Sequence, residues 1–120
     1  MANIIINVAE HICTPPELLS VSTGFSGGTD TVTFQITWDS IGDFYKQYVD
    51  PNTELILQYN YQDGNGWLTY PDNLSFQSPN DYAIQIAKNY GYLTVQFKLI
   101  LVTNSECGQM ESNVLSNMYT

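Results

Sequence analysis

The stretch "DGNG" at positions 63–66 carries two oxygen-bearing side chains at alternate positions, as the start of a calcium-binding loop does. A loop of the EF-hand type also needs oxygen ligands at later positions and a glutamate at the twelfth. Counted from Asp63, the fifth position is Trp67 and the twelfth is Leu74, so the pattern fails. Glycine and asparagine tolerate the positive φ of a tight hairpin, and strand-like sequence lies on both sides. The stretch is therefore predicted to be a turn.

A second candidate for metal or nucleophile chemistry lies near the N-terminus, where His11 is close to Cys13. A zinc site needs about four ligands, and Cys107 is the one further soft ligand in the chain. Catalysis of the Ser-His or Cys-His type would have to use His11, because the chain has a single histidine. We interpret His11 as an ordinary residue of an N-terminal arm.

Carboxylates could also perform chemistry, since the chain has twelve of them against three lysines and no arginine. Paired carboxylates that hydrolyse glycosides need a cleft that shifts their pKa values. Here they fall mostly in turn-like sequence, where aspartate is common. The glycine-rich "GFSGG" lacks the lysine and the following helix of a phosphate-binding loop. We expect a protein that is not an enzyme, with no catalytic, cofactor-binding or metal-binding residues.

The formal net charge of -9 bears on the class of partner. Phosphate binding needs clustered lysine or arginine, so nucleic acid and anionic membranes are unfavourable partners, and no small molecule is indicated either. No apolar stretch approaches the length of a membrane span, and the N-terminal sequence has neither the basic region nor the apolar run of an export signal. The chain is expected to be made in a cytoplasm and to interact with other proteins.

The elements that position these residues are predicted to be strands. Apolar and polar residues alternate with period two, as in "TVTFQITW", where Val32, Phe34, Ile36 and Trp38 share one face. About seven short strands separated by turn signals, in a single domain of this length, predict an all-β, two-sheet antiparallel sandwich. The connection at 39–50 is long and has room for one helical turn. Strand-like segments lie at 17–22, 31–38, 54–61, 81–87, 92–103 and 111–117.

From Pro15 to Asn117 the sequence resembles a fibronectin type III domain of the Ig-like class. The resemblance is carried by "PPELLSV" before the first strand, a core tryptophan (Trp38) ending the second, and "ELILQYNYQDGNGWLTY", in which Trp67 follows a hairpin turn. The C-terminal "TVQFKLILVTNSECGQMESNVLSN" is similar to the last two strands of that family. The resemblance implies a sandwich over residues 14–120, preceded by an extended N-terminal arm at 1–13.

The resemblance also implies that Cys13 and Cys107 lie at one end of the sandwich. A disulfide between them would tie the arm to the loop before the last strand. Two separate thiols in a reducing cytoplasm are the other possibility, and the spacing of the two residues does not decide between them.

Three groups of residues are candidates for contact with a partner. The arm carries Ile4, Ile5 and Ile6, which cannot all face inward in one strand, so the arm either folds back as an extra strand or adds to the sheet of a neighbouring subunit. The outward faces of two neighbouring strands carry apolar residues that either form one exposed patch or are scattered surface residues. Aromatic residues of the long connection either anchor a partner or cap the core. The residues on the outward strand faces are Ile56, Ile100 and Val102, and the aromatic residues of the long connection are Phe44, Tyr45 and Tyr48.

These observations favour a structural protein of a virion, most simply a decoration or auxiliary protein on the outside of a tailed-phage capsid. It would bind the major capsid protein or neighbouring copies through multivalent protein–protein contacts. The acidity suits an outer surface, and a composition rich in Asn, Ile and Tyr without Arg resembles proteins of crAss-like gut phages. The alternative hypothesis is a secreted or surface-displayed module of a bacterial protein that binds glycans or proteins, located outside the cell.

Overall fold

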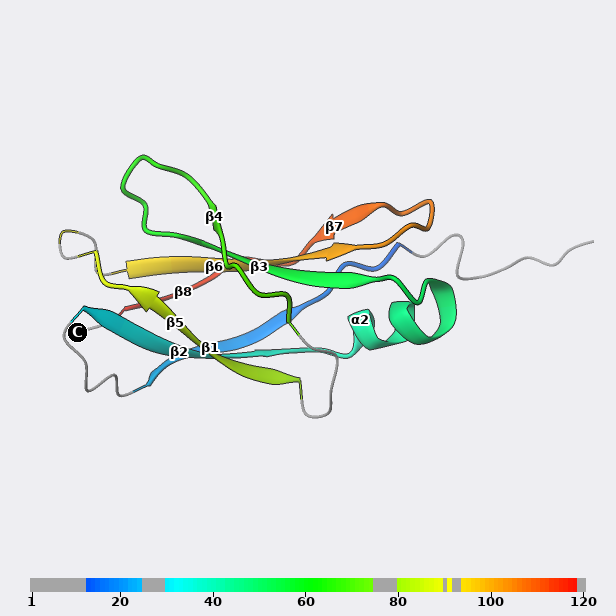
Figure 1. Ribbon diagram of the computed structural model, residues 1–120, viewed down its shortest axis with the longest axis horizontal. Helices are drawn as coiled ribbons and strands as arrows, with labels where there is room; N and C mark the ends of the chain where they lie inside the picture. The colour runs from blue at the N-terminus through cyan, green and yellow to red at the C-terminus, as the bar shows by residue number, and fades with distance from the viewer. Residues whose placement is uncertain (1–12, 25–29, 75–79, 90, 92–93, 119–120) are drawn as a thin grey trace, which may run out of the picture.

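The structure of the protein is a computed structural model that describes residues 13–24, 30–74, 80–89, 91 and 94–118 (Figure 1). The N-terminal Ile4–Ile6 segment and His11 lie outside the described residues. Eight strands and one short helical segment follow one another along the described chain. They are β1 (Leu18–Gly24), β2 (Thr31–Trp38), α2 (Ile41–Phe44) continuing as the π-helical η1 (Tyr45–Val49), β3 (Glu54–Asn60), β4 (Leu68–Thr69), β5 (Asp81–Ala87), β6 (Thr94–Val102), β7 (Gln109–Glu111) and β8 (Leu115–Met118).

The strands form two antiparallel sheets, which confirms the prediction of an all-β sandwich. One sheet has the order β1-β2-β5, and the other has the order β4-β3-β6-β7, with β8 also paired to β6. The strand expected at 111–117 is two strands in the structure. The register of β6 with β7 pairs Ile100 with Glu111, whereas its register with β8 pairs Phe97 with Leu115 and is shifted by one residue. The chain therefore leaves the ladder between β7 and β8.

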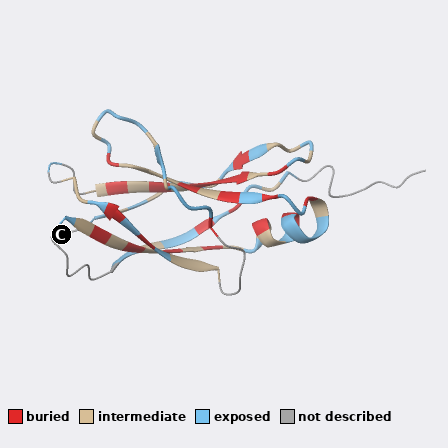
Figure 2. Ribbon diagram, in the orientation of Figure 1, coloured by how far each residue is buried: buried red, intermediate tan, exposed pale blue. Residues whose placement is uncertain are grey.

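The core lies between the two sheets, where the alternation of the sequence turns one face of each strand inward (Figure 2). Its centre is an edge-to-face contact between Phe34 of β2 and Phe97 of β6, with ring centroids 4.8 Å apart. β2 is the middle strand of its sheet, and β6 has neighbours on both sides in the other. The predicted core strand "TVTFQITW" indeed alternates between half-buried and buried residues along its whole length.

Asparagine side chains join the two sheets along one side of the sandwich, between β1 and β8. The Asn113 side chain pairs with Leu18 as a strand would, since its Oδ1 accepts the Leu18 N–H at 2.8 Å and its Nδ2 donates to the Leu18 carbonyl at 3.0 Å. Asn117 Nδ2 donates to the Val21 carbonyl at 2.8 Å, and the Thr23 hydroxyl donates to Asn117 Oδ1. We call this pair, Asn113 and Asn117, the asparagine bridge.

Tyrosine side chains lie along the opposite side, between β3–β4 and β5. The Tyr61 hydroxyl donates to the carbonyl of Ala87, the last residue of β5. The Tyr70 and Tyr82 rings are 6.5 Å apart, and burial is the largest of the effects that raise the pKa of Tyr70. Side chains from one sheet therefore reach the other on both sides of the core.

We predict that Asn113→Ala destabilises the domain by about 1–3 kcal/mol, because it leaves the N–H and carbonyl of Leu18 without their partner. Urea denaturation followed by tryptophan fluorescence measures the change. Asn73→Ala, at an exposed position between β4 and β5, is the matched control and should stay within about 0.5 kcal/mol of the native chain. Equal stability of the two variants would show that the asparagine bridge contributes nothing.

Candidate functional site

The helical segment that connects β2 to β3 lies at one end of the sandwich (Figure 1). Two of its aromatic side chains are exposed. Phe44 is 45% exposed and Tyr48 is 69% exposed, although most large apolar side chains of the described chain are buried. Their ring centroids are 5.3 Å apart, as expected for residues four apart on a helix. We call this end the helix pole and these two residues the aromatic pair.

Tyr45 lies on the opposite side of the same helical turn and is 3% exposed. Its hydroxyl accepts the N–H of Thr14 at 3.3 Å and lies 3.8 Å from the sulfur of Cys107. Of the two roles expected for Phe44, Tyr45 and Tyr48, Tyr45 therefore has that of capping the core. The helical period turns Tyr45 inward, where it connects the helix to the chain before β1 and to the loop between β6 and β7.

The structure joins Cys13 and Cys107 by a disulfide, with Cα atoms 5.5 Å apart. The bridge links the residues before β1 to the β6–β7 loop across 94 positions of sequence. It lies at the helix pole beside the Tyr45 hydroxyl, as the fibronectin resemblance implied for the two cysteines. The bridge therefore fixes the described residues before β1 to the same end as the aromatic pair.

Asp50, the residue after η1, holds the helix and two loops together. It is 7% exposed, and its carboxylate accepts the N–H of Asn104 at 2.6 Å and the N–H of Asn52 at 3.0 Å. These backbone hydrogen bonds, with that of Asn104 the largest effect, lower the pKa of Asp50 below its ordinary value. Its own carbonyl accepts the Thr53 hydroxyl at 2.6 Å. In the sequence, Asp50 belongs to the turn-like "DPN", where aspartate is common, and nothing in that pattern indicates these hydrogen bonds.

The apolar patch expected on the outer face of β3 and β6 is smaller than predicted. Ile56 does lie directly opposite Ile100, and Val102 is two residues further along β6. Ile100, however, is only 9% exposed, and Ile56 and Val102 are half-buried. Ile100 is covered at this position because β3 and β7 flank it on both sides. Its low exposure leaves Ile100 little surface with which to contact a partner.

Polar and charged side chains occupy the rest of that face. Lys98 lies over the Trp67 ring at 4.5 Å from its centroid and forms an ion pair with Glu111 at 3.1 Å. The cation–π contact and the ion pair use the Lys98 charge within the domain. This face therefore presents few unsatisfied groups, and the helix pole is the better candidate site.

The "DGNG" stretch is a turn, as predicted. The Asp63 carboxylate accepts the N–H of Asn65 at 3.0 Å and an Asn89 amide at 2.9 Å, and these bonds lower its pKa. Gly64 and Gly66 have φ of 95° and 77°, which a glycine adopts without strain. No three His, Cys, Asp or Glu residues in the part of the chain that the structure describes gather closely enough to hold a metal ion. None of the described helical segments is long and apolar enough to span a lipid bilayer.

No model of a known protein family matches the sequence, and no curated protein matches it either. The fold and the helix pole define the class of protein as a small, acidic, disulfide-linked all-β sandwich with an exposed aromatic pair at one end.

We predict that the double variant Cys13→Ser/Cys107→Ser loses about 3–5 kcal/mol of stability, because the bridge closes a long loop in the unfolded chain. Guanidinium denaturation of the two proteins measures the loss. Dithiothreitol should lower the midpoint of the native chain to that of the double variant and leave the variant unchanged. A native midpoint that does not respond to the reductant would contradict the role given to the bridge.

We predict that Asp50 makes stability depend on pH. Because folding lowers its pKa, its contribution is present above the ordinary value and is lost as the pH falls through the lowered value. Asp50→Asn should therefore be less stable than the native chain at about pH 7, and the difference should shrink by about pH 3. Urea denaturation at both pH values measures it, and Asp72→Asn, which removes an exposed carboxylate, controls for net charge. A difference that is the same at both pH values would exclude this role.

Proposed function

We propose that the protein is a non-enzymatic structural component of a virion, a decoration or auxiliary protein on the outside of a tailed-phage capsid. The observation that carries the proposal is the aromatic pair, two exposed rings on a helix whose remaining side is fixed to the domain. Tyrosine and phenylalanine anchors held in one conformation lose little entropy when they are buried against a partner.

The attachment of the helix pole supports an anchoring role. Tyr45 contacts Thr14 and Cys107, and Asp50 accepts the N–H of Asn104, so the helix is fixed both to the residues before β1 and to the β6–β7 loop. The Cys13–Cys107 bridge joins these two segments to each other. A virion assembles in a cytoplasm and then persists outside the cell, where a disulfide is stable. Many weakly bound copies on a repeating shell would together be retained far better than one.

We also propose that the sandwich is of the fibronectin type III-like kind. Its β3–β4 hairpin, with Trp67 following the turn, corresponds to the hairpin of that class, and β3 and β6 are neighbours as the corresponding strands are. Trp38 is buried at the end of β2, where the family has its core tryptophan. The support is a likeness of core and turn positions, which bears on fold and not on activity.

The disulfide favours a second candidate function, a secreted or surface-displayed module that binds a protein or a glycan. Disulfides are typical of proteins that mature in an oxidising compartment. In this function the aromatic pair would stack on the ligand. The two proposals differ in where the protein is found, on particles or on cells.

We predict that the chain co-purifies with phage particles on a density gradient, and that Phe44→Ala/Tyr48→Ala reduces its rebinding to stripped particles by at least about tenfold. Sedimentation of fluorescently labelled chain with the particles measures the binding. The rings are exposed, so their removal should leave the folded domain intact, as circular dichroism can verify.

Leu68→Ala/Met118→Ala is the matched control, since it removes two exposed apolar side chains that lie away from the helix pole. It should rebind like the native chain. Recovery of the native chain with cells or culture supernatant, and never with particles, would reject the virion proposal in favour of the second candidate.

A further inference from the structure

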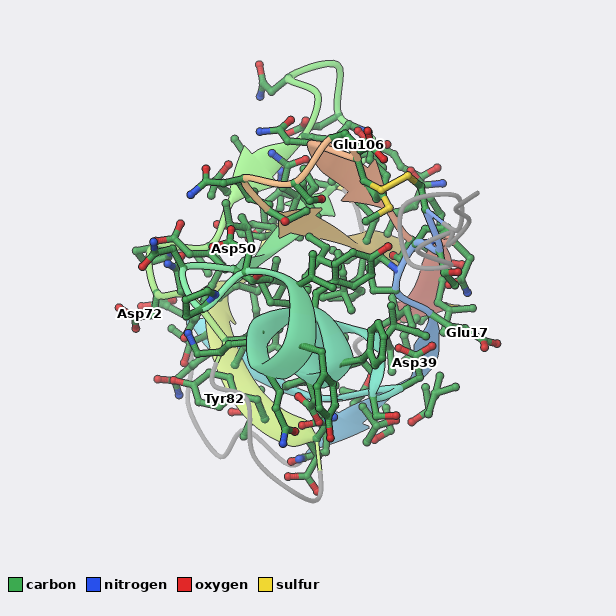
Figure 3. The ribbon with its side chains drawn as sticks, turned by 90° about the vertical axis from the view of Figure 1, so that its right-hand side faces the viewer. Glu17, Asp39, Asp50, Asp72, Tyr82 and Glu106 are labelled. Carbon is green, nitrogen blue, oxygen red and sulfur yellow. A yellow bond between two sulfur atoms is a disulfide. The ribbon has the colours of Figure 1, made fainter. Side chains whose placement is uncertain are left out.

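Several carboxylates lie at the helix pole (Figure 3). Asp39 and Asp43 lie just before and within the helix, and Asp50 follows it. Glu17 lies next to Asp39, whose N–H donates to the Glu17 carbonyl at 3.1 Å, and Glu106 lies beside the disulfide. In Figure 3 the helix pole faces the viewer, and the labelled residues Glu17, Asp39, Asp50 and Glu106 lie around the helix.

Positive charge is sparse among the described residues of this pole. The chain has three lysines, and the structure describes all of them. Lys88 is at the opposite end, where its N–H donates to the Asp30 carbonyl at 2.8 Å, and Lys98 is paired with Glu111. Lys46 is on the helix, and its Nζ donates to the Pro51 carbonyl at 2.8 Å. The field around the aromatic pair is therefore strongly negative, with one lysine against several carboxylates.

We propose that the partner of the helix pole is a protein surface on which an apolar socket for Phe44 and Tyr48 is bordered by lysine and arginine. The exposed rings supply the apolar anchor and can also accept a cation on their faces. The surrounding carboxylates attract a basic rim and repel an acidic one, so they determine orientation and the rate of association.

A second copy of the chain is a poor occupant of this surface. Two copies docked through the helix pole would bring the same carboxylates together, and each chain carries a net charge of -9. Nucleic acid and anionic lipid are repelled for the same reason. Charge complementarity therefore selects a basic protein partner.

This inference rests on the proposed function only in taking the aromatic pair as the contact surface, and its test needs no particle. The probes are a synthetic amphipathic peptide of leucine and lysine and the same peptide with glutamate in place of every lysine. Titration of the isotopically labelled full chain, followed by NMR, measures affinity and the position of binding together.

We expect the lysine peptide to bind and to perturb the amide signals of residues 41–49, 104–107 and 17, with the glutamate peptide not binding. Phe44→Ala/Tyr48→Ala should weaken binding at least about tenfold, whereas Leu68→Ala/Met118→Ala should not. Glu17→Gln/Glu106→Gln should reduce the dependence of affinity on salt between about 0.05 M and about 0.5 M NaCl, because these side chains are exposed at the rim.

Three results would overturn the inference: no binding of the lysine peptide, equal binding of the glutamate peptide, or perturbed signals away from the helix pole. The result is separable from that of the particle experiment. If the lysine peptide binds at the helix pole but the chain is absent from particles, the inference of a basic partner is supported and the virion proposal is rejected. If the chain binds particles through the aromatic pair but the lysine peptide does not bind, the virion proposal is supported and the inference of a basic partner is rejected.

Discussion

The contact between Phe34 and Phe97 is the interaction on which the rest of the structure depends. It joins an inner strand of one sheet to an inner strand of the other, so the apolar faces of all neighbouring strands are buried around it. Burial on this scale provides the free energy that orders the loops at both ends. The helix pole can keep two aromatic rings exposed because the core is complete without them.

The strands could be predicted from sequence because burial of one face imposes a period of two, and that period is written into segments such as 31–38 and 94–102. The helix pole was predicted as a group of aromatic residues but not in its orientation. Strand parity does not apply to a helix, in which Phe44 and Tyr48 share one side and Tyr45 faces another. The alternation also predicted that Ile100 lies on the outward face of β6. It did not predict that Ile100 is buried there, because that burial depends on neighbours from β3 and β7.

Hydrogen bonds between a side chain and a distant backbone group have no signature in the sequence. Asn113 reaches Leu18 across 95 positions, and Asp50 reaches Asn104 across 54. Each depends on where the ends of unrelated strands come to lie, so neither period nor spacing reveals it. The same holds for Thr14 and Tyr45, which connect the chain before β1 to the helix. At the helix pole these local bonds convert a long connection into a fixed surface.

The sides of the sandwich carry a further consequence. An edge strand with free backbone groups can pair with the edge of an identical neighbour, and proteins that are crowded together are most exposed to that reaction. Here the carbonyl at the end of β5 is occupied by the Tyr61 hydroxyl, and backbone groups of β1 are occupied by the asparagine bridge. These side chains hinder edge-to-edge strand pairing between copies, which is the step that would build fibrils. A domain whose edge strands offer a neighbour fewer free backbone groups is less prone to pair with an identical copy at high local density.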